Sequence, residues 1–120
     1  CSPGTRQGVT YSADYRFYAP AAIALRGIPA SLVPPNQSLR FRTVADGVQI
    51  YECAAPTSVP NVFTWRFKAP RATLRSNLPD RAQVGLHYGG ILVGRNAGPW
   101  WEIGNGGAAV RGAVVSQVAN

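Results

Sequence analysis

Residues 9–18, VTYSADYRFY, carry the clearest structural signal in the chain. Apolar or small side chains alternate with mostly polar ones through this stretch. Side chains of a β-strand point to opposite faces with a period of two, so ten residues of this kind predict a half-buried strand. Its inward face would carry Val9, Tyr11, Ala13, Tyr15 and Phe17. We expect the strand to end at Pro20, because proline cannot donate a hydrogen bond to a neighbouring strand.

The composition of the whole chain also favours strands over helices. Its 120 residues include 13 glycines and 10 prolines, but only one lysine, two glutamates and no methionine, which are common residues of exposed helices. A chain of this length is expected to form one domain with its own core. We therefore predict a small all-β domain.

A hairpin is predicted in the middle of the chain. Residues 38–45 and 48–53 both read as strands, and Asp46 and Gly47 separate them. Asp-Gly is a favoured two-residue hairpin turn, because both central residues adopt positive φ.

Further short strands follow this hairpin. Phe63, Trp65 and Phe67 should face inward on a strand that ends at Pro70. Beyond it, we expect strands near residues 72–75, 83–88, 90–94, 99–103 and 108–118. Antiparallel strands at such close spacing predict a β-sandwich or a barrel.

The prolines divide the chain into three parts. Residues 19–37 hold four prolines, which predict an ordered linker rather than a long helix. The expected organisation is an N-terminal strand at 1–18, a Pro/Ala-rich linker at 19–37 and a β domain at 38–120.

The two cysteines, Cys1 and Cys53, bear on the compartment. In an exported protein they would form one disulfide, and the alternative is two buried thiols. A chain that begins at Cys1 is typical of a product whose leader has been removed, so we expect a secreted or cell-surface protein. A lipid-modified Cys1 is the competing interpretation. No apolar run approaches the length of a membrane span, and Asn36 lies in a glycosylation acceptor pattern, Asn-Gln-Ser.

The chain is strongly basic, with a formal net charge of +7. This charge is compatible with binding to a polyanion, or simply with solubility. The arginines are scattered singly and accompany no nucleic-acid motif, so a nucleic-acid partner is not expected.

A search for catalytic and cofactor motifs yields little. A Ser-His-acid triad would have to use His87, the only histidine, and no Gly-x-Ser-x-Gly motif accompanies it. Two cysteines and one histidine do not make a structural zinc site, and the glycine stretches match no phosphate-binding loop. We therefore expect a non-catalytic protein without a cofactor or metal. The alternative is a hydrolase that uses Glu102 and His87.

One cluster of residue types could bind a ligand. Aromatic rings can cover the C–H face of a sugar while polar groups bind its hydroxyls. The candidate ligand-binding residues are His87, Tyr88, Trp100, Trp101, Glu102 and Asn105. The alternative is that one tryptophan packs in the core, the other covers an edge, and His87 is structural.

From Pro34 onward, the chain resembles an uncharacterised family of secreted bacterial and fungal domains of unknown function. The resemblance lies in GVQIYEC (47–53), FTWRFKAPRATL (63–74), GLHYGG (85–90), GPWWEIGNGG (98–107) and VRGAVVSQV (110–118). The family pattern Gly-Pro-Thr-Trp-Glu-x-x-Asp-Gly-Ser has Trp100, Asn105 and Gly107 here in place of Thr, Asp and Ser. The resemblance implies a fold and secretion, and no activity.

The N-terminal segment resembles the usual end of these family domains, which holds a cysteine and a Tyr-Ser/Thr-Ala-x-Tyr-x-Phe-Tyr strand. The hairpin that the family has after the position of Val118 is absent, so the chain resembles a shortened or circularly permuted domain. The resemblance implies a link between Cys1 and Cys53, within one chain or between two.

These features predict a secreted structural or interaction protein. Residues 9–18 could act as a donor strand that pairs with a neighbouring copy, which would build an oligomer or an extracellular filament. A domain that lacks strands would also expose an edge for such pairing. The alternative is a carbohydrate- or polyanion-binding module of the cell envelope.

Overall fold

The protein is a single antiparallel β-sheet. The computed structural model describes residues 1–20, 36–55, 58–59, 61–104 and 108–118. Its six strands lie in sequence order across the sheet, and one short 3-10 helix, η2 (Gly90–Leu92), follows the fourth. The strands are β1 (Arg6–Pro20), β2 (Gln37–Ala54), β3 (Thr64–Ser76), β4 (Gln83–Gly89), β5 (Pro99–Ile103) and β6 (Ala109–Arg111).

The prediction of an all-β antiparallel fold is confirmed, but the sheet of the described residues is open. β1 and β6 form its two edges and do not pair with each other. Neither a closed barrel nor a second sheet is formed by the part of the chain that the structure describes.

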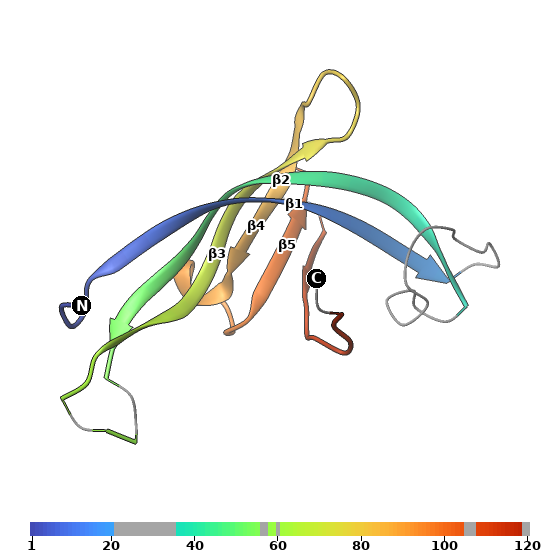
Figure 1. Cartoon of the computed structure of the whole chain (residues 1–120). Coiled ribbons are helices and arrows are strands. Elements are labelled where there is room, and N and C mark those ends of the chain that lie inside the picture. Colours follow the sequence, from blue (N-terminus) through green and yellow to red (C-terminus); the bar gives the residue numbers. More distant parts are fainter. Residues whose placement is uncertain (21–35, 56–57, 60, 105–107, 119–120) are drawn as a thin grey trace.

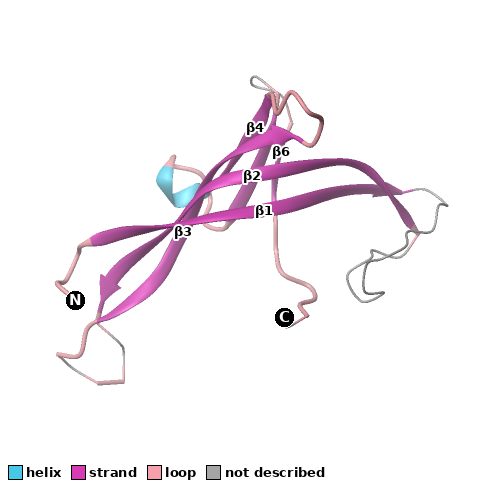
Figure 2. Cartoon of the chain, turned by 45° about the horizontal axis from the view of Figure 1, so that its top comes forward, coloured by secondary structure: helices cyan, strands magenta, loops and turns pink. Residues whose placement is uncertain are grey.

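β1 and β2 give the sheet its shape. They pair from Arg6 opposite Glu52 to Pro20 opposite Gln37, and both curve strongly along their length (Figures 1 and 2). The curvature brings Tyr15 of the edge strand β1 against His87 of β4 and Trp101 of β5, with ring centroids 5.0 and 5.5 Å apart. The sheet therefore covers part of its own face without a second layer.

This covered face, the inner face, holds the core. Its centre is Ala45, Ala72 and Leu74, of which Ala45 and Leu74 are fully buried. The two alanines allow neighbouring strands to curl toward each other, and larger side chains close around them. The inner face is defined by Tyr11, Ala13, Tyr15, Ala45, Ala72, Leu74, His87 and Trp101. We call the opposite side of the sheet the outer face.

The predicted hairpin at Asp46 and Gly47 is wrong, because β2 runs straight through both residues. Gly47 is not among the glycines with positive φ, so it does not form the expected turn. A Cβ at Gly47 would lie 2.2 Å from the backbone oxygen of Arg71 and 2.5 Å from Cα of Ala72. The glycine allows β3 to approach β2 closely.

Four other predictions about the strands are corrected. Pro70 does not end a strand, because it lies within β3 and pairs with Gln49 of β2. The pairing of β3 with β4 begins one residue later, at Arg71. The strand predicted at 90–94 begins instead with η2, and the one predicted at 108–118 is reduced to β6. Phe67 and Trp65, expected to face inward, are 54% and 44% exposed, because β2 and β3 extend beyond the core here.

The disulfide between Cys1 and Cys53 is confirmed and lies within the single chain. It fastens the start of β1 to the end of β2. Two backbone hydrogen bonds, from Gly4 N to Cys53 O and from Cys53 N to Thr5 O, support the same junction. Most of the predicted linker at 19–37 lies outside the described residues. No helix in the described ranges is long and apolar enough to cross a membrane.

Candidate functional site

The residues predicted to form one ligand site are divided between the two faces of the sheet. His87 pairs with Trp101, and Tyr88 pairs with Trp100, across β4 and β5. Because adjacent side chains on a strand point in opposite directions, His87 and Trp101 lie on the inner face. Tyr88, Trp100 and Glu102 lie on the outer face. Asn105 lies outside the described residues.

The inner-face group is an aromatic cluster in the core. The rings of His87 and Trp101 stack with centroids 4.4 Å apart, and Tyr15 meets both edge to face. Gly112 lies against this indole: a Cβ there would be 2.5 Å from Cζ3 of Trp101. His87 is 4% exposed, so this cluster offers little surface to a ligand.

Burial determines the protonation of this cluster. The Nδ1–H of His87 donates to the backbone oxygen of Trp100 at 2.9 Å. Burial lowers the pKa of His87, and the hydrogen bond opposes that effect only in part. Burial also raises the pKa of Tyr15. Both groups are therefore neutral near pH 7.

Some polar atoms of the inner face have no hydrogen-bond partner among the described residues. They are the hydroxyl of Thr43 and the indole nitrogen of Trp101. Leaving a buried polar group unpaired costs about 1–3 kcal/mol, so packing of the surrounding rings must offset this cost.

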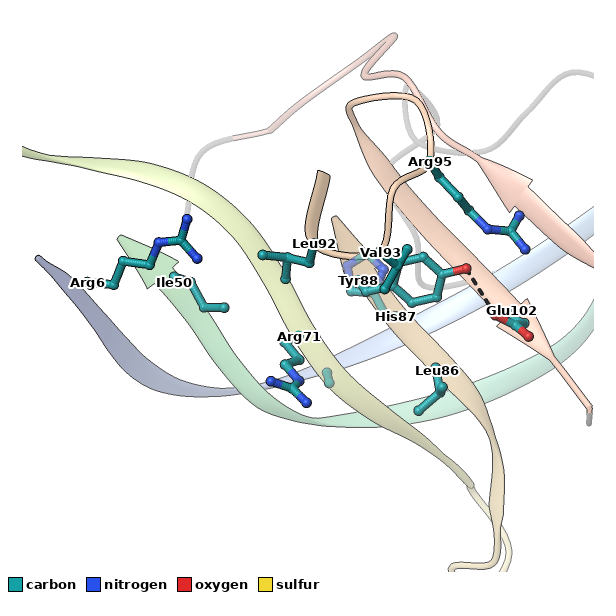
Figure 3. A pocket seen from close by; sticks show the side chains of 11 residues that line it. Arg6, Ile50, Arg71, Leu86, His87, Tyr88, Leu92, Val93, Arg95 and Glu102 are labelled. Atoms are coloured by element: carbon teal, nitrogen blue, oxygen red, sulfur yellow. Dashed lines mark hydrogen bonds between the residues drawn. The ribbon is translucent and has the colours of Figure 1, made fainter. Parts of the chain in front are cut away.

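Two residues of the outer face, Tyr88 and Glu102, line a pocket of about 650 Å³, and the buried His87 also contributes to its wall (Figure 3). β3 contributes Arg71, β4 contributes Leu86 and Tyr88, and β5 contributes Glu102. The remaining lining comes chiefly from the segment that follows β4 and from β1 and β2: Leu92, Val93, Arg95, Arg6 and Ile50. The pocket is therefore lined from five of the described strands, from η2 and from the loop after it.

Tyr88 and Glu102 are joined inside this pocket. The Tyr88 hydroxyl donates to Oε2 of Glu102 at 2.9 Å, as the dashed line in Figure 3 shows. Burial and this hydrogen bond raise the pKa of Tyr88, and the nearby Arg95 opposes the shift. The hydroxyl thus stays protonated and fixes the orientation of the carboxylate.

The loop between β4 and β5 positions Arg95. Backbone hydrogen bonds from Gly90 N to Gly98 O and from Arg95 N to Gly90 O, both 2.9 Å long, close this loop. The Trp100 indole donates to the backbone oxygen of Asn96 at 2.9 Å. The Arg95 guanidinium then lies 4.9 Å from the centroid of the Trp100 ring, within the range of a cation–π contact.

The sequence connected the arginines with polyanion binding only as a group and did not single out the three that line this pocket. Arg6, Arg71 and Arg95 are far apart in sequence and meet only through the sheet. The one usable signal was register, since Arg71 lies directly opposite Tyr88. No group of three or more metal-ligating side chains occurs within the described ranges.

Comparison with known proteins places the chain in a family. No curated protein and no solved structure matches it. One family model matches residues 34–120, which is more than half of the chain, and it covers β2 to β6 with every outer-pocket residue except Arg6. The chain therefore belongs to the family described as Protein of unknown function (DUF3455).

Proposed function

We propose that this chain is a secreted, non-catalytic structural or interaction protein that self-associates through its N-terminal strand. The observation that carries the proposal is the position of β1. Within the described part of the chain, it is a 15-residue strand at the edge of an open sheet, paired with β2 along one side only. Long unpaired edges invite pairing with another chain.

The edge carries few of the features that discourage such pairing. β1 contains no lysine, and its only proline is its last residue, Pro20. Its single irregularity is a shift of register between Phe17 and Tyr18. Natural edge strands are usually kept apart by charged side chains, especially lysine, and by proline, bulges or short length. β1 carries three charged residues, Arg6, Asp14 and Arg16, and the rest of its edge is suited to receive a further strand.

Exchange of β1 between copies is the second way to use this strand. A donated β1 would make the same pairs with β2 that the structure shows within one chain. The bond between Cys1 and Cys53 would then join two molecules instead of one. This identity of contacts is what makes strand exchange a low-cost route to oligomers.

The opposite edge supports an open assembly. β6 has only three residues, and the chain beyond it exposes Val114, Val115 and Val118, by 72%, 96% and 51%. Contact between unlike edges of successive copies need not close, and it can therefore build a filament. In such an assembly, a neighbouring copy would supply the sandwich or barrel partner that the open sheet of one chain lacks.

The covalent link between Cys1 and Cys53 supports the proposed compartment. A disulfide persists in oxidising environments, such as the extracellular space, which supports our proposal of a secreted or surface protein. In this proposal the outer-face and inner-face residues need no catalytic role.

Native mass tests the proposal. Size-exclusion chromatography with light scattering, together with negative-stain imaging, should show dimers or larger assemblies. Ser12→Lys places a charge on the exposed edge strand and should shift the protein toward the monomer, whereas Ser58→Lys, in an exposed loop, should not.

Non-reducing electrophoresis separates the two routes. Covalent multimers that collapse with reductant would show exchange of β1, because Cys1 would then be bonded to another chain. Non-covalent oligomers of internally bridged chains would show edge addition. A uniform monomer at single-chain mass, bridged internally, would overturn the proposal.

A further inference from the structure

We propose that the outer-face pocket binds an acidic oligosaccharide, that is, a sugar chain carrying carboxylate or sulfate groups. This inference goes beyond self-association, because the pocket lies on the outer face of the sheet and Arg6 is its only lining residue from an edge strand of the described sheet.

The charge of the lining favours an anion. Three arginines, Arg6, Arg71 and Arg95, line the pocket against one carboxylate, that of Glu102. The chain as a whole carries a net charge of +7, which attracts acidic ligands from solution. Guanidinium groups bind carboxylate and sulfate groups well, because their donors form a planar fork.

Two of these guanidinium groups have hydrogen-bond donors that a ligand could use. Arg71 is exposed and has no hydrogen bond or ion pair with the described residues. Arg6 lies 3.9 Å from Oε2 of Glu52, an oxygen that Lys68 already contacts at 2.6 Å. Neither arginine is needed to neutralise a buried acid.

Glu102 and the apolar lining favour a sugar among anionic ligands. The Tyr88 hydroxyl occupies Oε2 of Glu102 and leaves the other carboxylate oxygen able to accept from ligand hydroxyls. A carboxylate repels every anionic group, so Glu102 favours an anion that also carries neutral hydroxyl donors, as a sugar does. Leu86, Leu92 and Val93 offer an apolar surface for the C–H face of the ring.

The arrangement of charges fits a short chain better than a single anion. In Figure 3, Arg6 and Arg71 lie toward one side of the pocket and Arg95 with Glu102 toward the other, with Leu92 and Val93 between them. Acidic groups on neighbouring sugars could therefore reach separate arginines.

A nucleic acid is the less suitable polyanion. Single strands are held by stacking bases on accessible aromatic rings. The Tyr88 ring is only 7% exposed, and the Arg95 guanidinium lies over the Trp100 ring. The pocket thus offers cations and a hydroxyl acceptor, without an open platform for bases.

Calorimetry at fixed ionic strength tests the proposal with four probes: an oligogalacturonate, a heparin-derived oligosaccharide, a neutral maltooligosaccharide and a single-stranded DNA. We expect binding of one or both acidic sugars, and the better of the two identifies carboxylate or sulfate as the recognised group. Binding of neither acidic sugar, or DNA binding at least as tight, would overturn the proposal.

Three variants that each lose one positive charge show whether the pocket is where the acidic sugar binds. Arg71→Gln and Arg95→Gln should each weaken binding by about tenfold, the usual effect of losing a charge-assisted hydrogen bond. Arg66→Gln removes the same charge from an exposed position on β3 outside the pocket and should have little effect. Equal losses in all three variants would show non-specific charge attraction and contradict the pocket.

Glu102→Gln distinguishes sugar recognition from simple attraction. Glutamine keeps an oxygen acceptor for Tyr88 but is a weaker acceptor for ligand hydroxyls, so binding of the acidic sugar should weaken. Tighter binding of every polyanion, DNA included, would instead mean that Glu102 only repels ligands, and the proposal would fail. Light scattering on the same samples keeps this result separate from any change in self-association.

Discussion

The imidazole of His87 stacks on the indole of Trp101, with ring centroids 4.4 Å apart and ring planes 16° apart. The two residues lie opposite each other on β4 and β5, and Tyr15 reaches them from the far edge of the sheet. This contact between the first strand and the fourth and fifth holds the curvature of an open sheet. Its integrity therefore matters for the whole fold.

Stability should fall as the pH falls through the titration of His87. Burial lowers the pKa of His87 in the folded protein below its ordinary value of 6.5. The unfolded chain then binds the proton first, so the free energy of unfolding is constant above about pH 7.5 and decreases as the pH drops through about 6.5. Urea unfolding at pH steps between about 7.5 and 5 measures this slope.

His87→Gln is the control, because it removes the only histidine of the chain. The variant should be less stable at pH 7.5 but should lose the slope between pH 7.5 and 5. Depression of the Glu52 pKa by Lys68 adds a separate loss of stability only at lower pH, as that carboxylate becomes protonated. A slope that persists in His87→Gln would assign it to another group.

The alternation of side chains between the two faces of a strand explains how much of the candidate site the sequence could predict. Alternation placed Tyr11, Ala13 and Tyr15 on one face of β1, as the structure shows. The same rule, applied to His87-Tyr88 and Trp100-Trp101, would have divided the predicted site in two. The prediction of one site used the residue types of that cluster and did not apply the alternation of neighbouring residues between faces.

Curvature and long-range register could not be predicted in this way. The approach of Tyr15 to Trp101 depends on how strongly five strands curl, and the pocket arginines meet only after the strands are aligned. Neither property is local in the sequence. The wrong prediction of a turn at Asp46 and Gly47 has the opposite cause. Here the local sequence favours a turn, but pairing with β1 and β3 on both sides of β2 keeps the strand continuous.

Substitution of Gly47 tests that explanation. In Gly47→Ala the added Cβ would meet the backbone of Arg71 and Ala72 at 2.2–2.5 Å, and backbone cannot move aside as a side chain can. We expect a loss of about 3 kcal/mol in the free energy of unfolding, at the upper end for overpacking. Chemical denaturation measures it.

Gly8→Ala provides the matched comparison on β1. Its Cβ would come no closer than 3.3 Å to the Val48 side chain, and the expected loss is about 1 kcal/mol or less. If Gly47→Ala were as mild as Gly8→Ala, the close approach of β3 to β2 would not be the reason for glycine at position 47.

Removal of the disulfide should release the start of β1. The bond between Cys1 and Cys53 closes a loop with a sequence separation of 52 residues, for which the chain-entropy model gives about 4 kcal/mol of stabilisation. The double variant Cys1→Ser/Cys53→Ser should lose stability on this scale. Hydrogen exchange should accelerate first in residues 4–10, next to the lost bond.

Reduction of the native protein is the check on this prediction. The reduced protein should reproduce both the loss of stability and the local exchange. Uniform acceleration across all strands, without an early effect at residues 4–10, would show that the bond stabilises the fold only globally.

Truncation of Leu74 should be the most damaging change in the core. Leu74 is fully buried at the centre of the inner face, and its only fully buried hydrophobic neighbour in that cluster is Ala45, which is too small to fill the space left by a shortened side chain. Leu74→Ala should therefore cost about 3–5 kcal/mol, toward the upper part of the range for such cavities.

Leu78→Ala, at a position that is 61% exposed, removes the same atoms and should cost about 0.5 kcal/mol or less. Denaturation midpoints of the two variants at equal protein concentration give the comparison. Similar losses for both would mean that the inner face is not the core that stabilises this open sheet.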